Sequence, residues 1–418
     1  MPKPFNSKRI NLALKSAAVA GILGLVACGE SSSSSQGSQF SQASSNTTPP
    51  SDDFNQMSLL QNLTDNVIVP TYTKFAELAV AQDTAVGNYC NALTSQATDT
   101  EAMQNLAKQS WRDAMAVWQM AEVMQLGPLL DNNNSLRNKI YSWPNTSACA
   151  VDQDVVLAEQ GGYDISTRTA SRKGLDAIEY LLFNPNLNHS CTVFGTQPQD
   201  WDNRTEENRT AARCALAKIV AADLVSNGEE LLTAWNGTAT AQGYADILKN
   251  AGQVDSIFSD VHDAVNDVSD AIFYTDTLTK DAKLATPLGM VANDCGLVPC
   301  VENVESRFAF NSLQNIINNI QGLNMIFLGG ETDSGVGFED YLIDVGAAET
   351  ATQMRGDLTV VSEFATALQQ SLSELLAQDP QQVQQVHDQL KKVTDNMKTD
   401  FIQSLALELP ATSAGDND

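Results

Sequence analysis

The sequence predicts an all-α fold of two helical bundles, and three observations carry this prediction. Apolar residues recur at intervals of three and four along most of the chain. Alternating strand patterns are scarce, and clusters of β-branched residues are short. The 418 residues are enough for two packed domains of ordinary size, and helical chains of this kind commonly form bundles.

Helix-breaking residues divide this pattern into segments. We expect a first helix over residues 59–93, with Pro70 marking a kink or a break. Thr98 and Glu101 have the spacing of a capping box, which would open a second helix that stops at Gly127. The sequence then predicts a long stretch rich in loops at 132–169.

A short apolar helix follows this stretch and ends before Asn184-Pro185, because a residue that precedes proline disfavours helical geometry. The segment 186–203 is polar and separates this helix from the rest of the chain. Further helices are expected at five segments: 206–235, 253–274, 312–328, 339–377 and 380–409.

The polar segment suggests where one bundle ends and the next begins. We place the boundary near Asp200, so that residues 54–200 form the first bundle and residues 201–410 form the second. Residues 411–418 are expected to be a disordered tail.

The N-terminus has the pattern of a lipoprotein signal peptide over residues 1–27. Basic residues precede a short apolar run, 16–27, which ends in small residues directly before Cys28. The run is too short to span a bilayer, so an uncleaved anchor is a weaker alternative, as is a plain secretory signal. We expect Cys28 to be lipidated and, since Gly29 is not the aspartate that retains lipoproteins in the inner membrane, we expect an outer-membrane lipoprotein that faces the periplasm.

Residues 28–53 are rich in Ser, Gln, Asn, Thr and Pro, and we expect them to form a flexible tether. The whole chain carries a formal net charge of −27. This charge excludes nucleic acid as a partner, since phosphate backbones would be repelled. A generally acidic, solvated surface accounts for most of it, and the charge alone specifies no site.

Six cysteines remain after Cys28, and an even number in an exported chain favours disulfides over metal thiolates. They are Cys90, Cys149, Cys191, Cys214, Cys295 and Cys300. The last two bracket a short turn and could close a small loop, whereas the other four allow three pairings. Zinc is disfavoured, because there is no Cys-x-x-Cys pair and the chain has 3 histidines.

Asp176 and Glu179 pose the main chemical question of this sequence. They lie three residues apart on one face of a helix whose remaining residues, 177–183, are almost entirely apolar. An ionised carboxylate that is buried without a partner costs several kcal/mol. The pair therefore needs a metal ion, a basic side chain or several hydrogen-bond donors.

Two further carboxylates are candidates for the same site. Glu122 is in line with an aromatic stripe that includes Trp111 and Trp118, but it could equally cap the stripe or pair with an arginine, such as Arg112 or Arg172. Glu305 precedes an apolar helix, where a carboxylate also interacts favourably with the helix dipole. Arg307 is a natural counter-ion for a buried carboxylate.

Several stretches resemble the imelysin-like family, and they occur in the same order. They are the segment from Trp111 to Gly127-Pro128, the segment 174–182, and Glu305-Ser306-Arg307-Phe308 leading to Asn319-x-x-Gly322. The family is associated with bacterial iron uptake and is also classed among metallopeptidases. The resemblance implies two related helical bundles with a site near their junction, and it implies iron-uptake proteins of the envelope as partners.

The family signature is Gly-x-His-x-x-Glu, and this chain departs from it at one position. Gly174 and Glu179 match, whereas Asp176 stands where the family has histidine. Carboxylates in place of imidazole favour hard cations such as iron or calcium. We therefore expect any metal to be held by Glu122, Asp176, Glu179 and Glu305.

The sequence thus predicts an imelysin-like lipoprotein that binds a metal or another ligand in support of iron acquisition and does not cleave peptides. One alternative is a metallopeptidase that uses Glu179 as base or ligand, although the chain lacks a His-Glu-x-x-His motif. Another alternative is a non-catalytic scaffold or a polysaccharide-binding lipoprotein.

Overall fold

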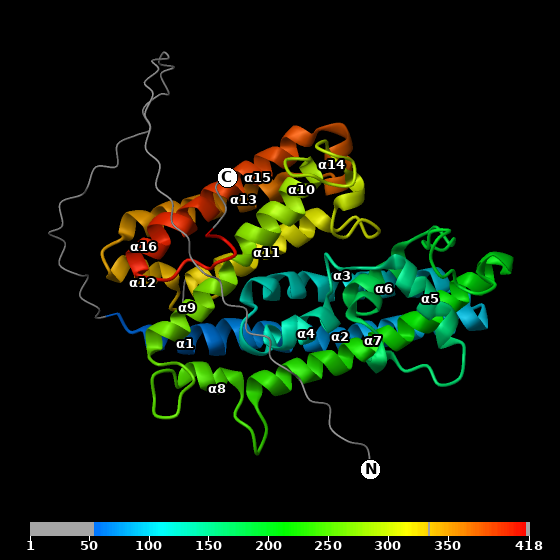
Figure 1. The fold of residues 1–418 in the computed structure, drawn as a ribbon, viewed down its shortest axis with the longest axis horizontal. Helices are drawn as coiled ribbons and strands as arrows, with labels where there is room; N and C mark the ends of the chain where they lie inside the picture. The colour runs from blue at the N-terminus through cyan, green and yellow to red at the C-terminus, as the bar shows by residue number, and fades with distance from the viewer. Residues whose placement is uncertain (1–53, 333–334, 415–418) are drawn as a thin grey trace, which may run out of the picture. The chain divides into compact units, whose positions relative to one another are not determined.

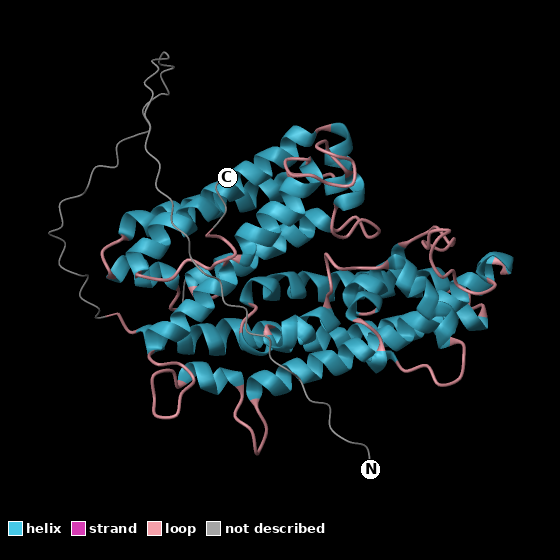
Figure 2. Cartoon of the chain, in the orientation of Figure 1, coloured by secondary structure: helices cyan, strands magenta, loops and turns pink. Residues whose placement is uncertain are grey.

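A computed structural model describes residues 54–332 and 335–414, and it confirms the all-α prediction (Figure 1; Figure 2). Within these residues, extended pairing is limited to a bridge between Asn293 and Gly296. No helix in the described ranges is both long and apolar enough to cross a membrane. The expected signal peptide and tether, 1–53, and residues 415–418 of the expected tail lie outside the described residues.

The first group of helices is built around α2. It comprises α1 (Gln56–Leu63), the π-helical turn η1 (Thr64–Ile68), α2 (Val69–Ser95), α3 (Thr100–Ala121), α6 (Gly174–Phe183), α7 (Glu206–Asn236) and the short α8 (Tyr244–Lys249). Helix α2 packs along both α3 and α7, and α6 also packs on α7 (Figure 1). Although α7 follows residue 200, where we expected the boundary between bundles, its packing partners belong to the first group.

The second group follows α8. It comprises α9 (Val261–Ile272), the π-helical segment η7 (Thr275–Ala285), α10 (Thr286–Leu288), α11 (Ser312–Leu328), α12 (Phe338–Asp344), α13 (Ala348–Ala367), α14 (Leu372–Gln378), α15 (Pro380–Asn396), η9 (Met397–Phe401) and α16 (Ile402–Leu405). Helix α15 packs against α13 and η7. The groups meet where α11 packs on α3 and where α9 packs on α1.

The stretch 132–169 contains two helices, so the prediction that it is rich in loops was wrong. Helix α4 (Asp131–Ile140) opens with Asn132, Asn133 and Asn134 in the left-handed conformation, and this polar run contains no apolar residue that a periodicity search could detect. Helix α5 (Ala148–Ala158) begins at Ser147, whose hydroxyl caps the N–H of Ala150.

Other helix boundaries also differ from the prediction. The expected helix 339–377 is three helices, because Gly346 has a left-handed φ of 87° and Ser371 starts α14 with a capping box. The expected helix 253–274 starts later, at the cap Asp260, and continues through η7 into α10. Helix α3 starts after Asp99 without a side-chain cap, so the expected capping box at Thr98 is absent.

Pro70 interrupts the first helix as predicted. It lies at the start of α2, directly after the π-helical turn η1. Proline has no N–H to donate, and a wider turn before it accommodates this loss.

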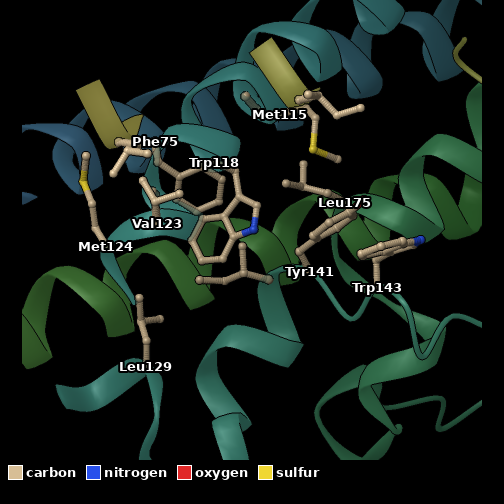
Figure 3. Packing of buried hydrophobic residues seen from close by; sticks show 14 of the residues in the cluster. Phe75, Met115, Trp118, Val123, Met124, Leu129, Tyr141, Trp143 and Leu175 are labelled. Atoms are coloured by element: carbon tan, nitrogen blue, oxygen red, sulfur yellow. The ribbon is translucent and has the colours of Figure 1, made fainter. Parts of the chain in front are cut away.

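The aromatic stripe on α3 holds the first group together. Trp118 lies against Phe75 of α2, with ring centroids 4.9 Å apart, and Figure 3 shows both side chains within the buried core. The indole N–H of Trp111 donates to the carbonyl oxygen of Leu175 at 2.8 Å. This contact fixes the first turn of α6 on α3 and thereby positions Asp176.

The six cysteines form three disulfides, which confirms the prediction. They pair as Cys90–Cys214, Cys149–Cys191 and Cys295–Cys300. The first joins α2 to α7, and the last closes the short loop expected from the sequence.

Candidate functional site

A pocket of about 490 Å³ lies where segments of the two groups face each other. The first group contributes Asp176 and Glu179 from α6, and the second contributes Glu305 and Arg307 from the loop before α11. Glu122 is not among the lining residues. The structure thus brings three of the four expected carboxylates to one pocket and places the fourth behind it.

Asp176 is partly exposed to the pocket and is held by Ser142. The Ser142 N–H donates to Oδ1 at 3.0 Å, and its hydroxyl donates to Oδ2. Burial raises the pKa of Asp176 to about 6, against the opposing effect of these hydrogen bonds. Ser142 follows the end of α4, and Asp176 lies in the first turn of α6. The two residues meet because α6 begins beside α4.

Gly174 explains why α6 can begin there. Its φ is 78°, and a Cβ at this position would lie 2.5 Å from the carbonyl oxygen of Ile140. Only glycine allows both this conformation and this approach. The matching glycine of the family signature is therefore a packing requirement of the site.

Glu179 is buried and anchored by backbone groups. Its Oε1 accepts from the N–H groups of Phe308 at 2.9 Å and Ala309 at 3.0 Å. Burial raises the pKa of Glu179 to about 8; these hydrogen bonds oppose the rise, and the nearby Asp176 and Glu305 add to it. No ion pair joins Asp176 or Glu179 to a basic side chain within the described part of the chain.

Glu305 is neutralised by a lysine that the sequence analysis did not identify. Lys283 of η7 is 1% exposed, and its Nζ lies 2.9 Å from Glu305 Oε1. Tyr141 donates to the same oxygen at 2.9 Å, and Asn315 donates to the other at 2.8 Å. The π-helical winding of η7 hides Lys283 from a search based on the α-helical period.

Glu122 forms a second buried ion pair. Its Oε1 lies 2.9 Å from Nη2 of Arg137, and its Oε2 lies 3.6 Å from Nζ of Lys283. Trp118 and Tyr274 donate hydrogen bonds to the same carboxylate. The alternative of an arginine partner is therefore the one realised, but the partner is Arg137, which lies in the stretch expected to be a loop.

The buried network has equal numbers of acidic and basic members. Glu122 and Glu305 face Arg137 and Lys283, so their charges cancel, as a buried network requires. Asp176 and Glu179 receive no such compensation. The two pocket carboxylates of α6 are thus chemically distinct from the two behind them.

Arg307 does not contact a carboxylate. It is exposed at the pocket, and its guanidinium lies over the Phe308 ring, 4.8 Å from the centroid. The expectation that it serves as the counter-ion is corrected by the ion pairs of Arg137 and Lys283.

The donors of the pocket are oxygen atoms, which suit a hard cation. All three histidines are elsewhere: His189 lies near Asp202, His262 contacts the Ala406 carbonyl, and His387 lies beside Asp388. In the described part of the chain, one group of three or more His, Cys, Asp or Glu residues has its potential ligand atoms within 4.8 Å of one another. It consists of Cys295, Cys300 and Glu302, and its two cysteines form a disulfide. Asp176 and Glu179 could supply part of a coordination shell, with water or a bound ligand completing it.

Fold and pocket together define a class of proteins: helical proteins of two packed groups with an acidic pocket at their junction. The chain belongs to the Imelysin family, whose sequence profile matches residues 68–399. It is 24% identical over 274 residues to iron-regulated protein A of Synechococcus elongatus. That match covers 66% of this chain and 65% of the relative, so the chain spans about two thirds of the relative's length.

Two solved structures share the fold. A protein described as an iron-regulated protein A precursor from Parabacteroides distasonis superposes with a TM-score of 0.64 at 18% identity, over 86% of this chain and 97% of that chain. An imelysin-like protein from Psychrobacter arcticum has a TM-score of 0.61 at 16% identity, over 85% and 96%. Both comparisons confirm the helical architecture expected from the resemblance.

Proposed function

We propose that this protein binds a cation, with iron or calcium as the first candidates, in the junction pocket, in support of iron acquisition and without cleaving peptides. The observation that carries the proposal is the pair Asp176 and Glu179, two carboxylates that face one pocket without an ion pair. A bound cation would take the place of the proton that burial favours on these carboxyl groups, which form no ion pair with Arg137 or Lys283. The iron-regulated names of the relatives support iron as the first ion to test.

Peptide cleavage is the weaker candidate. No histidine lines the described pocket, so it offers no pair of imidazoles to zinc. Glu179 does have a carboxyl group whose raised pKa suits proton transfer near neutral pH. The peptidase would be favoured if the protein cleaves casein and if this cleavage is lost both when a chelator is added and in the Glu179→Gln variant.

The test is calorimetric titration of the full-length protein, purified in detergent, with ferrous, ferric and calcium salts. We expect Asp176→Asn/Glu179→Gln to abolish binding. The matched control is Asp344→Asn/Glu349→Gln, which removes two exposed carboxylates from α12 and α13 and should bind as the wild type does. Equal binding by the site variant and the control would refute the proposal, provided that both melt at the wild-type temperature.

We also propose that the protein is an outer-membrane lipoprotein anchored through Cys28, based on the signal pattern of residues 1–27. Mass spectrometry of the membrane-bound protein should find an acylated N-terminal Cys28. The Cys28→Ser variant should leave the membrane fraction, whereas retention of this variant would contradict the anchor.

A further inference from the structure

We propose that the pocket takes its cation as a complex with a small anionic chelator, a metal carboxylate, in which Asp176 and Glu179 face the metal and Arg307 binds a carboxylate of the chelator. This inference rests on the proposed function and names the class of ligand for the same pocket.

The size of the pocket is the first argument. Six waters around a metal ion occupy about 180 Å³ in total, at about 30 Å³ for each water. The pocket measures about 490 Å³, a volume typical of sites for small organic ligands. A bare hydrated ion would leave much of this space to solvent, whereas a chelate would occupy more of it.

The second argument is the charge of Arg307. Within the described residues, three basic side chains make neither a hydrogen bond nor an ion pair: Lys108, Arg112 and Arg307. Of these, Arg307 lines the junction pocket. Its guanidinium is a fork of donors that matches a carboxylate, and it is free to bind one.

Phe308 connects the two charged ends of the pocket. Its backbone N–H holds Glu179 at 2.9 Å, and its ring lies under the Arg307 guanidinium. The ring also packs edge-on against Tyr180, with centroids 5.2 Å apart, and Trp143 lines the pocket as well. These aromatic faces suit the carbon framework of a chelator.

The remaining rim charges disfavour a free anion. Asp294 and Glu302 are exposed at the pocket and, together with Asp176, make it negative. A chelator without metal would meet this negative field with only Arg307 in its favour. The metal is therefore needed to bring the carboxylate in.

The test is calorimetry of the full-length protein with ferric citrate, citrate alone, calcium chloride and, without oxygen, ferrous sulfate. We expect ferric citrate to bind at least about tenfold more tightly than the free ions or citrate alone, since it adds a charge-assisted contact. Arg307→Gln should lower the ferric citrate affinity about tenfold and should not lower the affinity for free ions, because it removes a positive charge from the pocket. Arg307→Lys should lose less, because it keeps the charge.

Lys392→Gln is the control, because it removes an exposed basic side chain of α15 that does not line the pocket. Equal affinity for ferric citrate and free ions would overturn the inference while leaving the proposed function intact. The inference also fails if Arg307→Gln weakens all ligands alike, or if citrate alone binds as well as its iron complex. Absence of wild-type binding to every probe would instead overturn the proposed function itself.

Discussion

At the scale of single residues, the four carboxylates in and behind the pocket differ in the partners that surround them. Glu122 and Glu305 form ion pairs with Arg137 and Lys283 in the interior. Asp176 and Glu179 depend on hydrogen bonds from Ser142 and from backbone N–H groups. Because these partners are neutral donors, the carboxyl groups of Asp176 and Glu179 can each bind either a proton or a cation.

Glu122→Gln should destabilise the protein strongly. The change leaves Arg137 and Lys283 buried with one carboxylate between them, and breaking a buried pair typically costs about 3–5 kcal/mol. The control is Glu230→Gln, which breaks a half-exposed pair with Lys139 and should cost about 1 kcal/mol or less. Urea unfolding measures both, and similar losses would show that the network is not important for stability.

The raised pKa of Glu179 predicts a specific pH dependence. The folded pKa is about 8 and the ordinary value is 4.5, so the folded state binds this proton more tightly than the unfolded state. The resulting stabilisation is complete below pH 4.5 and is lost as the pH rises through 8. The free energy of unfolding should therefore fall more steeply over this range in the wild type than in Glu179→Gln. Parallel curves from urea titrations at each pH would contradict this assignment.

At the scale of elements, close helix approaches set the geometry of the junction. Gly322 of α11 lies against α3, where an added Cβ would be 2.5 Å from the carbonyl oxygen of Met120. One turn earlier on α11, Asn319 donates to the Gln119 carbonyl at 2.7 Å and accepts from Lys283 at 2.8 Å. The spacing of Asn319 and Gly322 thus serves both the packing and the buried network.

Gly322→Ala should push α11 away from α3. We expect a loss of about 1–3 kcal/mol in urea unfolding, typical of overpacking, and weaker cation binding in the same variant. Gly356→Ala on α13 is the control, because its Cβ would meet nothing within 4 Å. Alanine is the better helix former there, so this control should be neutral or up to about 1 kcal/mol more stable. A stable Gly322→Ala variant would show that the interface can relax.

At the scale of the whole molecule, the two groups of helices share one buried network. Lys283 and Glu305 come from the second group, yet they contact Gln119 and Glu122, at the end of α3, and Tyr141, which follows α4. Neither group can expose these partners without leaving buried charges unpaired. The two groups should therefore unfold together.

Tryptophan fluorescence and far-ultraviolet circular dichroism can test this cooperativity. All 5 tryptophans lie between residues 111 and 235, so fluorescence reports the first group, whereas dichroism reports the helices of both groups. We expect the two urea curves to coincide, as they do for a two-state transition. Separate midpoints would show that the groups unfold as independent units.

Much of the architecture was predictable because it depends on local patterns. The period of apolar residues defined helices α7 and α11 closely, and the cysteine count in an exported chain indicated disulfides. The prediction was wrong where local signals are weak, as in α4 with its three left-handed asparagines. It was also wrong where a helix breaks at a special conformation, as at Gly346.

The sequence by itself determined the helical class, the family and the carboxylates that could form a site, because each follows from residue patterns that can be recognised without knowing which segments meet in space. Only the tertiary structure decided that Glu122 and Glu305 are neutralised and that Asp176 and Glu179 are not. That distinction depends on Arg137 and Lys283, which reach the cluster from a stretch expected to be a loop and from a π-helical segment. Charge compensation acts through space over a few ångströms, and a linear sequence does not record those distances.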